Sequence, residues 1–204
     1  GAGAVLTEQA DGPEGDAPRP QAQLGRFLVL EGIDGCGKTT QLQALADWLP
    51  TSGLMPAGAT LVCTREPGGT ELGQALRQLL LHSTGGQAPH HQAELLLYAA
   101  DRAQHLAQVI RPALFAGHWV LCDRFTDATF AYQGAGRGFD TQVLSQLEHW
   151  VQTQPGQGLR QPDLTLWFVL DPAMAAQRLA KARLPDRFES QPLAFFQRAH
   201  DGYA

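Results

Sequence analysis

One glycine-rich motif constrains the fold of this chain more than any other feature. It is Gly32-Ile33-Asp34-Gly35-Cys36-Gly37-Lys38-Thr39, which has the pattern G-x4-G-K-T. A buried-strand pattern precedes it and a helical pattern follows it, the context in which such a loop wraps the phosphates of a nucleotide. Backbone N–H groups and the helix N-terminus supply positive potential there. The residues expected to bind the nucleoside triphosphate are Gly32, Ile33, Asp34, Gly35, Cys36, Gly37, Lys38, Thr39 and Thr40.

Two side chains of this loop carry its expected chemistry. Lys38 would neutralise charge on the β- and γ-phosphates, and the Thr39 hydroxyl would be a ligand of Mg²⁺. A second metal ligand is expected at Asp123, because an acid at the end of a strand can orient a hydrated Mg²⁺.

The hydrophobic pattern after Arg26 predicts an α/β fold. Four mostly continuous apolar runs are typical of parallel strands that are covered on both faces. These runs are Phe27–Glu31, Thr60–Thr64, Trp119–Asp123 and Leu164–Leu170. Helical patterns lie between and after them, at Thr39–Trp48, Glu71–Leu81, Gln92–Phe115, Thr141–Thr153, Ala173–Arg183 and Gln191–Tyr203. The alternation predicts a doubly wound parallel sheet with helices on both faces, in one domain over residues 25–204.

Composition narrows the possibilities further. A hydrophobic content of 44% is enough for a core, although residues 1–24, rich in Gly, Ala, Pro and acids, are expected to form a mobile leader. The net charge of −5 argues against a nucleic-acid partner. Because no apolar run approaches about 18 residues, no membrane partner is expected either. The three scattered cysteines indicate a reduced, cytoplasmic environment.

Two clusters in the middle of the chain suggest a second ligand. Residues 64–70, TREPGGT, form a glycine-rich turn at the end of the second expected strand. Ligands of open α/β sheets bind outside such strand ends, although a plain turn with a surface ion pair fits equally well. Tyr98 and Arg102 are four residues apart and share one helical face. The pair suits a stacked base and a phosphate or carbonyl, and a core tyrosine beside a solvated arginine is the alternative.

Two basic features complete the pattern. Arg124 directly follows the third expected strand, where it can hold an acceptor phosphate. A run of cations lies near the C-terminus, at Arg178, Lys181, Arg183 and Arg187. Such a run is usually a solvated helix face. Beside a phosphate-binding loop it is equally consistent with a lid that closes over phosphates, expected at about residues 178–189.

Together these segments resemble the bacterial thymidylate kinases, a family of P-loop nucleoside monophosphate kinases. The similar segments, in the family's order, are LEGIDGCGKTTQ, TREPGGT, YAADR, DRFTDATFAYQG with GRG, PDLTLWFVL and DRFE. The resemblance implies Mg²⁺-dependent transfer of the γ-phosphoryl group of ATP to dTMP, giving dTDP and ADP on the route to dTTP. It also implies a homodimer formed through the helix layer, for which the apolar third helix offers surface.

The resemblance further implies how dTMP binds. Asp34 would contact the 3′-hydroxyl, Tyr98 would stack on thymine and Arg102 would bind a base carbonyl. Thr129 and Gln133, the latter expected in a loop after the third strand, would read the base edge. Tyr132 would disfavour a 2′-hydroxyl, and Arg65 and Arg124 would hold the phosphate. The full set expected to bind dTMP is Asp34, Arg65, Pro67, Tyr98, Arg102, Arg124, Thr129, Tyr132 and Gln133.

The resemblance also implies where the catalytic cations lie. They are Lys38, Arg124, Arg178, Arg183 and Arg187. One family subtype carries a catalytic arginine in the P-loop at the position of Gly35, so here that arginine is expected in the lid. The family's final strand, which would be the fifth of the sheet, its adenine-contacting loop and its closing helix would follow Ala204. We therefore expect the chain to be a truncated piece.

Two alternatives stay open at this point. The nearest alternative is another P-loop kinase, which acts on a different nucleoside monophosphate or on a deoxynucleoside. A nucleotide-dependent switch or an inactive binding module is the alternative from another class. The sequence contains no N-K-x-D guanine signature, and a set of acceptor-site residues would have no use in a switch.

Overall fold

A four-stranded parallel sheet forms the centre of the computed structural model, which describes residues 24–155, 158–182 and 193–203. The strands are β1 (Phe27–Glu31), β2 (Leu61–Arg65), β3 (Trp119–Asp123) and β6 (Leu164–Trp167), in the order β2-β3-β1-β6. In the register, Phe27 pairs with Val120 on one side of β1, and Leu28 pairs with Leu164 on the other. The four expected strands are confirmed, with β2 displaced by one residue and β6 ending three residues early.

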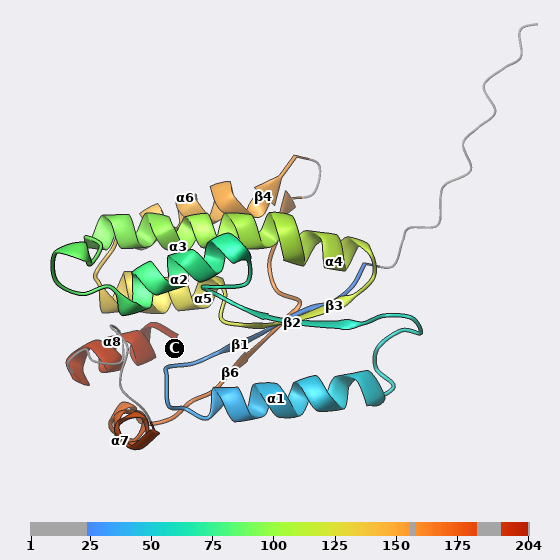
Figure 1. Ribbon diagram of the computed structural model, residues 1–204, viewed down its shortest axis with the longest axis horizontal. Helices are drawn as coiled ribbons and strands as arrows, with labels where there is room; N and C mark the ends of the chain where they lie inside the picture. Colours follow the sequence, from blue (N-terminus) through green and yellow to red (C-terminus); the bar gives the residue numbers. More distant parts are fainter. Residues whose placement is uncertain (1–23, 156–157, 183–192, 204) are drawn as a thin grey trace, which may run out of the picture.

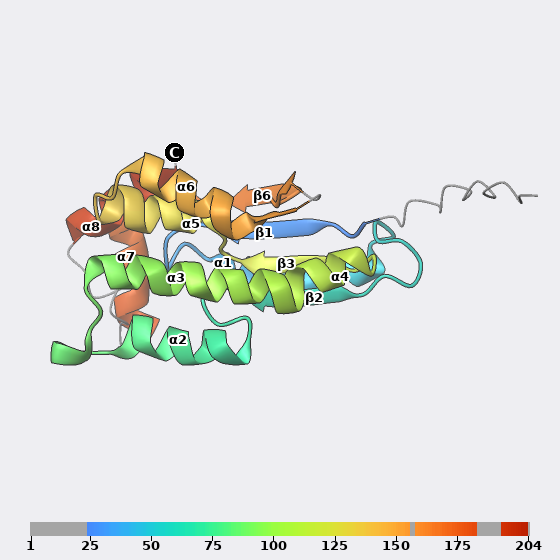
Figure 2. The same cartoon turned by 90° about the horizontal axis from the view of Figure 1, so that it is seen from above.

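Helices cover both faces of this sheet, as expected for a doubly wound fold (Figure 1). Helix α1 (Lys38–Trp48) lies on one face, and α2 (Glu71–His82), α3 (His91–His105) and α6 (Thr141–Gln152) lie on the other. Helices α7 (Pro172–Ala182) and α8 (Leu193–Tyr203) lie at the end of the sheet where β1 leads into α1 (Figure 2). Two expected features lie largely outside the described residues. The expected leader does so except for Leu24, and most of the expected lid does so as well, including Arg183 and Arg187.

The long third helical pattern is continuous but changes its geometry. Helix α3 passes into a π-helical turn, η3 (Leu106–Ile110), and then into α4 (Arg111–Phe115). Pro112, the second residue of α4, has no N–H to donate to an earlier carbonyl. Proline is a common reason for a wider turn at such a point. The hydrophobic period does not reveal this turn, because the helix stays buried on the same side.

The segment after β3 is helical, so the expectation that Gln133 lies in a loop is wrong. Helix α5 (Thr126–Thr129) continues into a π-helical stretch, η4 (Phe130–Gly136). The glycines of this segment suggested a loop, but η4 packs closely on α8. A Cβ on Gly136 would lie 2.9 Å from Phe195 Cε2. Tertiary packing thus overrides the weak helix propensity of glycine.

Four short elements have no counterpart in the predicted pattern. They are the 3₁₀ turns η1 (Leu49–Thr51) and η2 (Gly85–Gln87) and a small antiparallel hairpin of β4 (Thr153–Gln154) and β5 (Gly158–Leu159).

Two hydrophobic clusters form the core, one around Phe27 and Ile110 and one around Ile33 and Leu80. Within the described ranges, no helix has both the length and the apolar character needed to cross a membrane.

Candidate active site

The phosphate-binding loop lies between β1 and α1, as its sequence context predicts. Gly35 and Gly37 adopt φ angles of 83° and 89°, which favour glycine, and Gly37 is the N-cap of α1. At Gly32 a Cβ would come within 2.7 Å of the Phe168 carbonyl oxygen, so a side chain does not fit. The first N–H groups of α1 are therefore presented at the carboxyl edge of the sheet, where an anion can bind.

Lys38 and Asp123 meet at this edge. Lys38 Nζ lies 2.5 Å from Asp123 Oδ1, and the lysine is buried whereas Asp123 is partly exposed. Thr39 and Thr40 are exposed at the start of α1. The Thr39 hydroxyl and the Asp123 carboxylate are hard oxygen donors, which suit Mg²⁺. Over the described ranges no cluster of three or more His, Cys, Asp or Glu side chains could hold a metal. In proteins Mg²⁺ usually takes few side-chain ligands beside phosphate and water.

A cleft opens beside the loop, and we call it the main cleft. Eight of the nine residues expected to bind dTMP line it, and the exception is Arg65. Arg65 is exposed at the end of β2, outside the lining. Arg77 of α2 lines the cleft instead and donates through Nη1 to the Pro67 carbonyl oxygen at 2.9 Å.

Arg124 connects the P-loop with the main cleft. It is the one non-glycine residue with a positive φ angle, 70°, among the described residues, and such conformations often occur at functional sites. Its Nη2 atom lies 2.5 Å from Asp34 Oδ1 and donates to the Tyr132 hydroxyl at 3.2 Å. The guanidinium also lies over the Tyr132 ring, 5.1 Å from its centroid. A fixed cation is therefore held where the cleft meets the loop.

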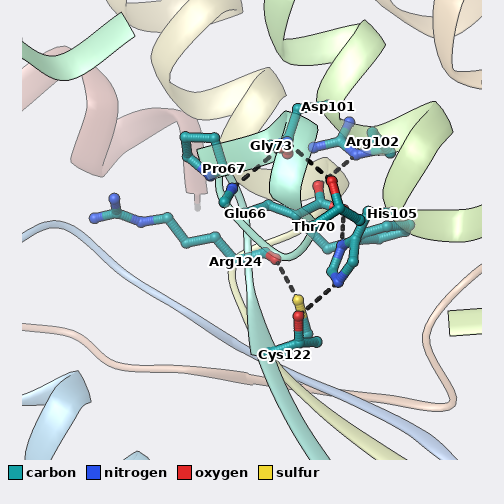
Figure 3. A network of polar contacts seen from close by, with 12 residues as sticks. Glu66, Pro67, Thr70, Gly73, Asp101, Arg102, His105, Cys122 and Arg124 are labelled. Atoms are coloured by element: carbon teal, nitrogen blue, oxygen red, sulfur yellow. Dashed lines mark hydrogen bonds and ion pairs between the residues drawn. The ribbon is translucent and has the colours of Figure 1, made fainter. Parts of the chain in front are cut away.

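Arg102, which lines the main cleft, belongs to a buried ionic network (Figure 3). Arg102 Nε donates to Glu66 Oε1 at 2.8 Å, and His105 Nδ1 lies 2.8 Å from Glu66 Oε2. His105 Nε2 lies 2.6 Å from the Thr64 hydroxyl. Burial alone would raise the pKa of Glu66, but Arg102 and His105 lower it below its ordinary value. Arg102 is therefore an organised part of the site and not a solvated side chain.

The glycine-rich turn is tied to the same helix. The Gly68 N–H donates to Asp101 Oδ1 at 3.1 Å, and a Cβ on Gly73 would lie 2.5 Å from that oxygen. Burial is the main reason that the pKa of Asp101 rises to about 6, and the nearby Glu66 carboxylate adds to it.

Five residues at or near the site were not expected from the sequence, and three of them share a signal. Glu94, Asp101 and His105 are buried on α3, whereas Arg77 lies on α2 and Glu31 on β1. Positions 94, 98, 101, 102 and 105 follow a helical spacing of three and four residues, so they form one polar stripe on α3. A polar stripe within an otherwise apolar helix could have identified them.

Glu31 is a second buried carboxyl group, at the end of β1. Its Oε1 accepts from the Phe125 N–H at 2.7 Å, and the Tyr203 hydroxyl lies 3.0 Å from Oε2. The pKa of Glu31 is raised to about 8, mainly because the carboxyl group is buried. The hydrogen bond from the Phe125 N–H and the positive charge of Arg124 lower this pKa, but by less than burial raises it. This carboxyl group links α8 to the strand that carries the P-loop.

The raised pKa of Glu31 predicts a pH dependence of stability. The native carboxyl group holds its proton more tightly than the unfolded one, with pKa values of about 8 and 4.5. The free energy of unfolding should therefore fall as the pH rises from about 4.5 to about 8, by up to about 1.4 kcal/mol per pH unit. Glu31→Gln should lose this contribution. Denaturant unfolding of both proteins across that range measures it, and parallel stability curves would contradict the assignment.

Of the three lid arginines expected to be catalytic, Arg178 is the one that lies within the described residues. It is exposed on α7, and a Cβ on Gly37 would lie 3.8 Å from its Nη1 atom. The guanidinium therefore lies beside the phosphate-binding loop.

The sheet, the P-loop and the adjoining cleft define the class of the P-loop nucleoside monophosphate kinases. Comparison with known proteins narrows this class. Residues 30–204 match the family model of thymidylate kinase, and the chain belongs to this family.

Individual relatives agree with this assignment. The thymidylate kinase of Synechococcus sp. (strain RCC307) is 63% identical over 180 residues, which are 88% of this chain and 82% of that protein. The thymidylate kinase of Prochlorococcus marinus (strain MIT 9313) is 58% identical over 180 residues, which are 88% of this chain and 81% of that protein. The crystal structure of thymidylate kinase from Ehrlichia chaffeensis aligns with a TM-score of 0.67 at 34% identity, covering 90% of this chain and 81% of the other.

Proposed function

We propose that this protein transfers the γ-phosphoryl group of ATP to dTMP in the synthesis of dTTP. The observation that carries the proposal is one cleft that joins Tyr98, Arg102, Arg124 and Gln133 to the phosphate-binding loop. Membership of the thymidylate kinase family supports the same reaction and the same acceptor. Two ligand sites thus share one edge of the sheet, as a kinase requires.

The main cleft supports a specific way of holding dTMP. Tyr98 would stack on the base while Arg102, held by Glu66, would reach a base carbonyl. Thr129 and Gln133 would read the base edge, and the buried Tyr132 would leave no room for a 2′-hydroxyl. Asp34 would accept from the 3′-hydroxyl, and Pro67 would pack at the cleft wall. Arg65 would act at the rim, because it is exposed outside the lining.

The transfer itself needs no general base. An anionic oxygen of the dTMP phosphate forms a bond to the γ-phosphorus of ATP, and the bond from that phosphorus to the β–γ bridging oxygen breaks to give ADP. The difficulty is to bring two polyanions together, so catalysis is positioning and charge neutralisation. Lys38 and Arg124 supply fixed cations, and Arg178 would add one from α7. Thr39 and Asp123 would hold Mg²⁺, which would supply further neutralisation of phosphate charge.

An assay of ADP release tests the acceptor. The protein with ATP and Mg²⁺ should release ADP faster with dTMP than with dCMP, dGMP or thymidine. Little ADP should form without an acceptor, because closure of the lid over the phosphates would exclude water. Preference for thymidine would indicate a deoxynucleoside kinase. ATP binding without transfer to any acceptor would indicate an inactive module.

We also propose a homodimer formed through the helix layer. Leu95, Leu106 and Ile110 of the apolar third helical segment are buried within the protomer. Leu96, in contrast, is 60% exposed, and Trp150 of the neighbouring α6 is 79% exposed. Light scattering at micromolar concentration should report about twice the monomer mass of 22.0 kDa. A monomer under these conditions would contradict the dimer.

A further inference from the structure

The amide group of Gln133 is fixed on one side and unpaired on the other. Its Nε2 donates to Glu94 Oε1 at 3.1 Å, whereas its buried Oε1 has no hydrogen-bond partner among the described residues. Gln133 lines the main cleft although its side chain is almost completely buried. A buried acceptor without a partner is costly unless a ligand supplies a donor. The cleft is where such a donor can reach it.

Glu94 decides which end of this amide faces the cleft. Its side chain is completely buried on α3, and Arg137 Nε lies 3.3 Å from the same Oε1 atom. An ionised carboxylate has acceptors and no donor, so the amide nitrogen and not the carbonyl oxygen must face it. Arg137 and Glu94 form a buried ion pair at this atom. Gln133 is therefore held in one of its two amide orientations.

We infer that Glu94 is a positioning residue that turns the carbonyl oxygen of Gln133 toward the acceptor base. It thereby selects a base with an N–H at the edge that Gln133 reads. This inference rests on the proposed function and adds the residue that sets its specificity. Thymine and uracil carry a proton on ring nitrogen N3 and can donate to this oxygen. Cytosine has a lone pair on N3, so two acceptors would face each other.

Glu94 could have two different roles, and they have different effects on activity. As part of a buried ion pair it would affect folding and all acceptors alike. As an orienting group it affects the ratio of kcat/KM for dTMP to kcat/KM for dCMP. Only that ratio depends on which end of the Gln133 amide faces the base. Sites that bury an unpaired polar group against the wrong substrate discriminate strongly.

Glu94→Gln tests the orientation directly. A glutamine at position 94 can accept from Gln133 or donate to it, so Gln133 becomes free to turn over. The measurement is kcat/KM for dTMP and for dCMP, which differ in the base and share the deoxyribose phosphate. In the wild-type protein the ratio should strongly favour dTMP. In Glu94→Gln it should fall by at least about tenfold, the usual effect of one buried unpaired polar group.

Two further variants separate orientation from loss of the ion pair. Arg137→Lys keeps both the acceptor-only carboxylate and its cation, so the ratio should stay within about threefold of the wild-type value. The double variant Glu94→Gln/Arg137→Met removes both buried charges and should show the same lowered ratio as Glu94→Gln. It also keeps the test available if the single variant fails to fold, because it leaves no unpaired charge.

The outcomes distinguish the inference from the function on which it rests. An unchanged dTMP-to-dCMP ratio in folded Glu94→Gln or in the double variant would overturn the role of Glu94. An equal fall of the ratio in Arg137→Lys would overturn it too, because packing of the ion pair would then be the cause. A wild-type protein that transfers phosphate equally well to dCMP contradicts the selection by Gln133. A wild-type protein that does not use dTMP at all contradicts the proposed function itself.

Discussion

Lys38→Ala is expected to lower kcat for phosphoryl transfer by at least about a hundredfold while the protein stays folded. Lys38 is buried at the start of α1, and its ammonium group lies beside Asp123 at the edge where phosphates would bind. It would follow the charge of the moving phosphoryl group, and a contact of this kind contributes about 3 kcal/mol to the stability of the transition state. The measurement is kcat at saturating ATP and dTMP, with circular dichroism to verify the fold.

A matched variant shows whether the effect belongs to the site. Arg26 is an exposed cation at the opposite end of β1, 3.9 Å from Asp163. Arg26→Ala removes one positive charge from the protein but none from the phosphate-binding edge, so its kcat should stay close to the wild-type value. If Lys38→Ala also turned over normally, the phosphate-binding loop would not be the donor site.

The sheet and the phosphate-binding loop could be predicted because their signals are local. Parallel strands covered on both faces read as continuous apolar runs, and Phe27–Glu31 and Trp119–Asp123 are correct to the residue. The loop motif needs a strand before it and a helix after it, and both are present. The order of the strands then brings the residues that follow β1, β2 and β3 to one edge.

The parts that could not be predicted depend on contacts between distant segments. Gln133 lies in a helical turn because η4 packs on α8, more than 50 residues away in the chain. The partner of Arg102 is Glu66 on another element, so spacing on α3 could indicate the face but not the ion pair. Arg65 and Glu66 are neighbours in sequence, yet one is exposed and the other buried. Alternation along a strand end allows either assignment until the register is known.

Glu66→Leu is expected to lower the free energy of unfolding by about 3–5 kcal/mol, because it leaves the Arg102 guanidinium buried without its carboxylate. The side chains of Glu66 and Arg102 are 4% and 8% exposed, so water cannot replace the lost partner. His105 would lose its partner at Nδ1 as well. Denaturant unfolding measures this change. Glu71→Gln, on the exposed first turn of α2, should cost less than about 1 kcal/mol and serves as the control.

The double variant Glu66→Leu/Arg102→Met separates charge burial from packing. Replacing a whole buried ion pair by apolar groups of similar size is often close to neutral. The double variant should therefore be more stable than Glu66→Leu, although it has lost more of the native contacts. Its KM for dTMP should still rise far more than its KM for ATP, because Arg102 lines the main cleft and not the phosphate-binding loop. A double variant no more stable than Glu66→Leu would show that an unpaired Arg102 is not the source of the cost. Equal changes in both KM values would remove Arg102 from the acceptor site.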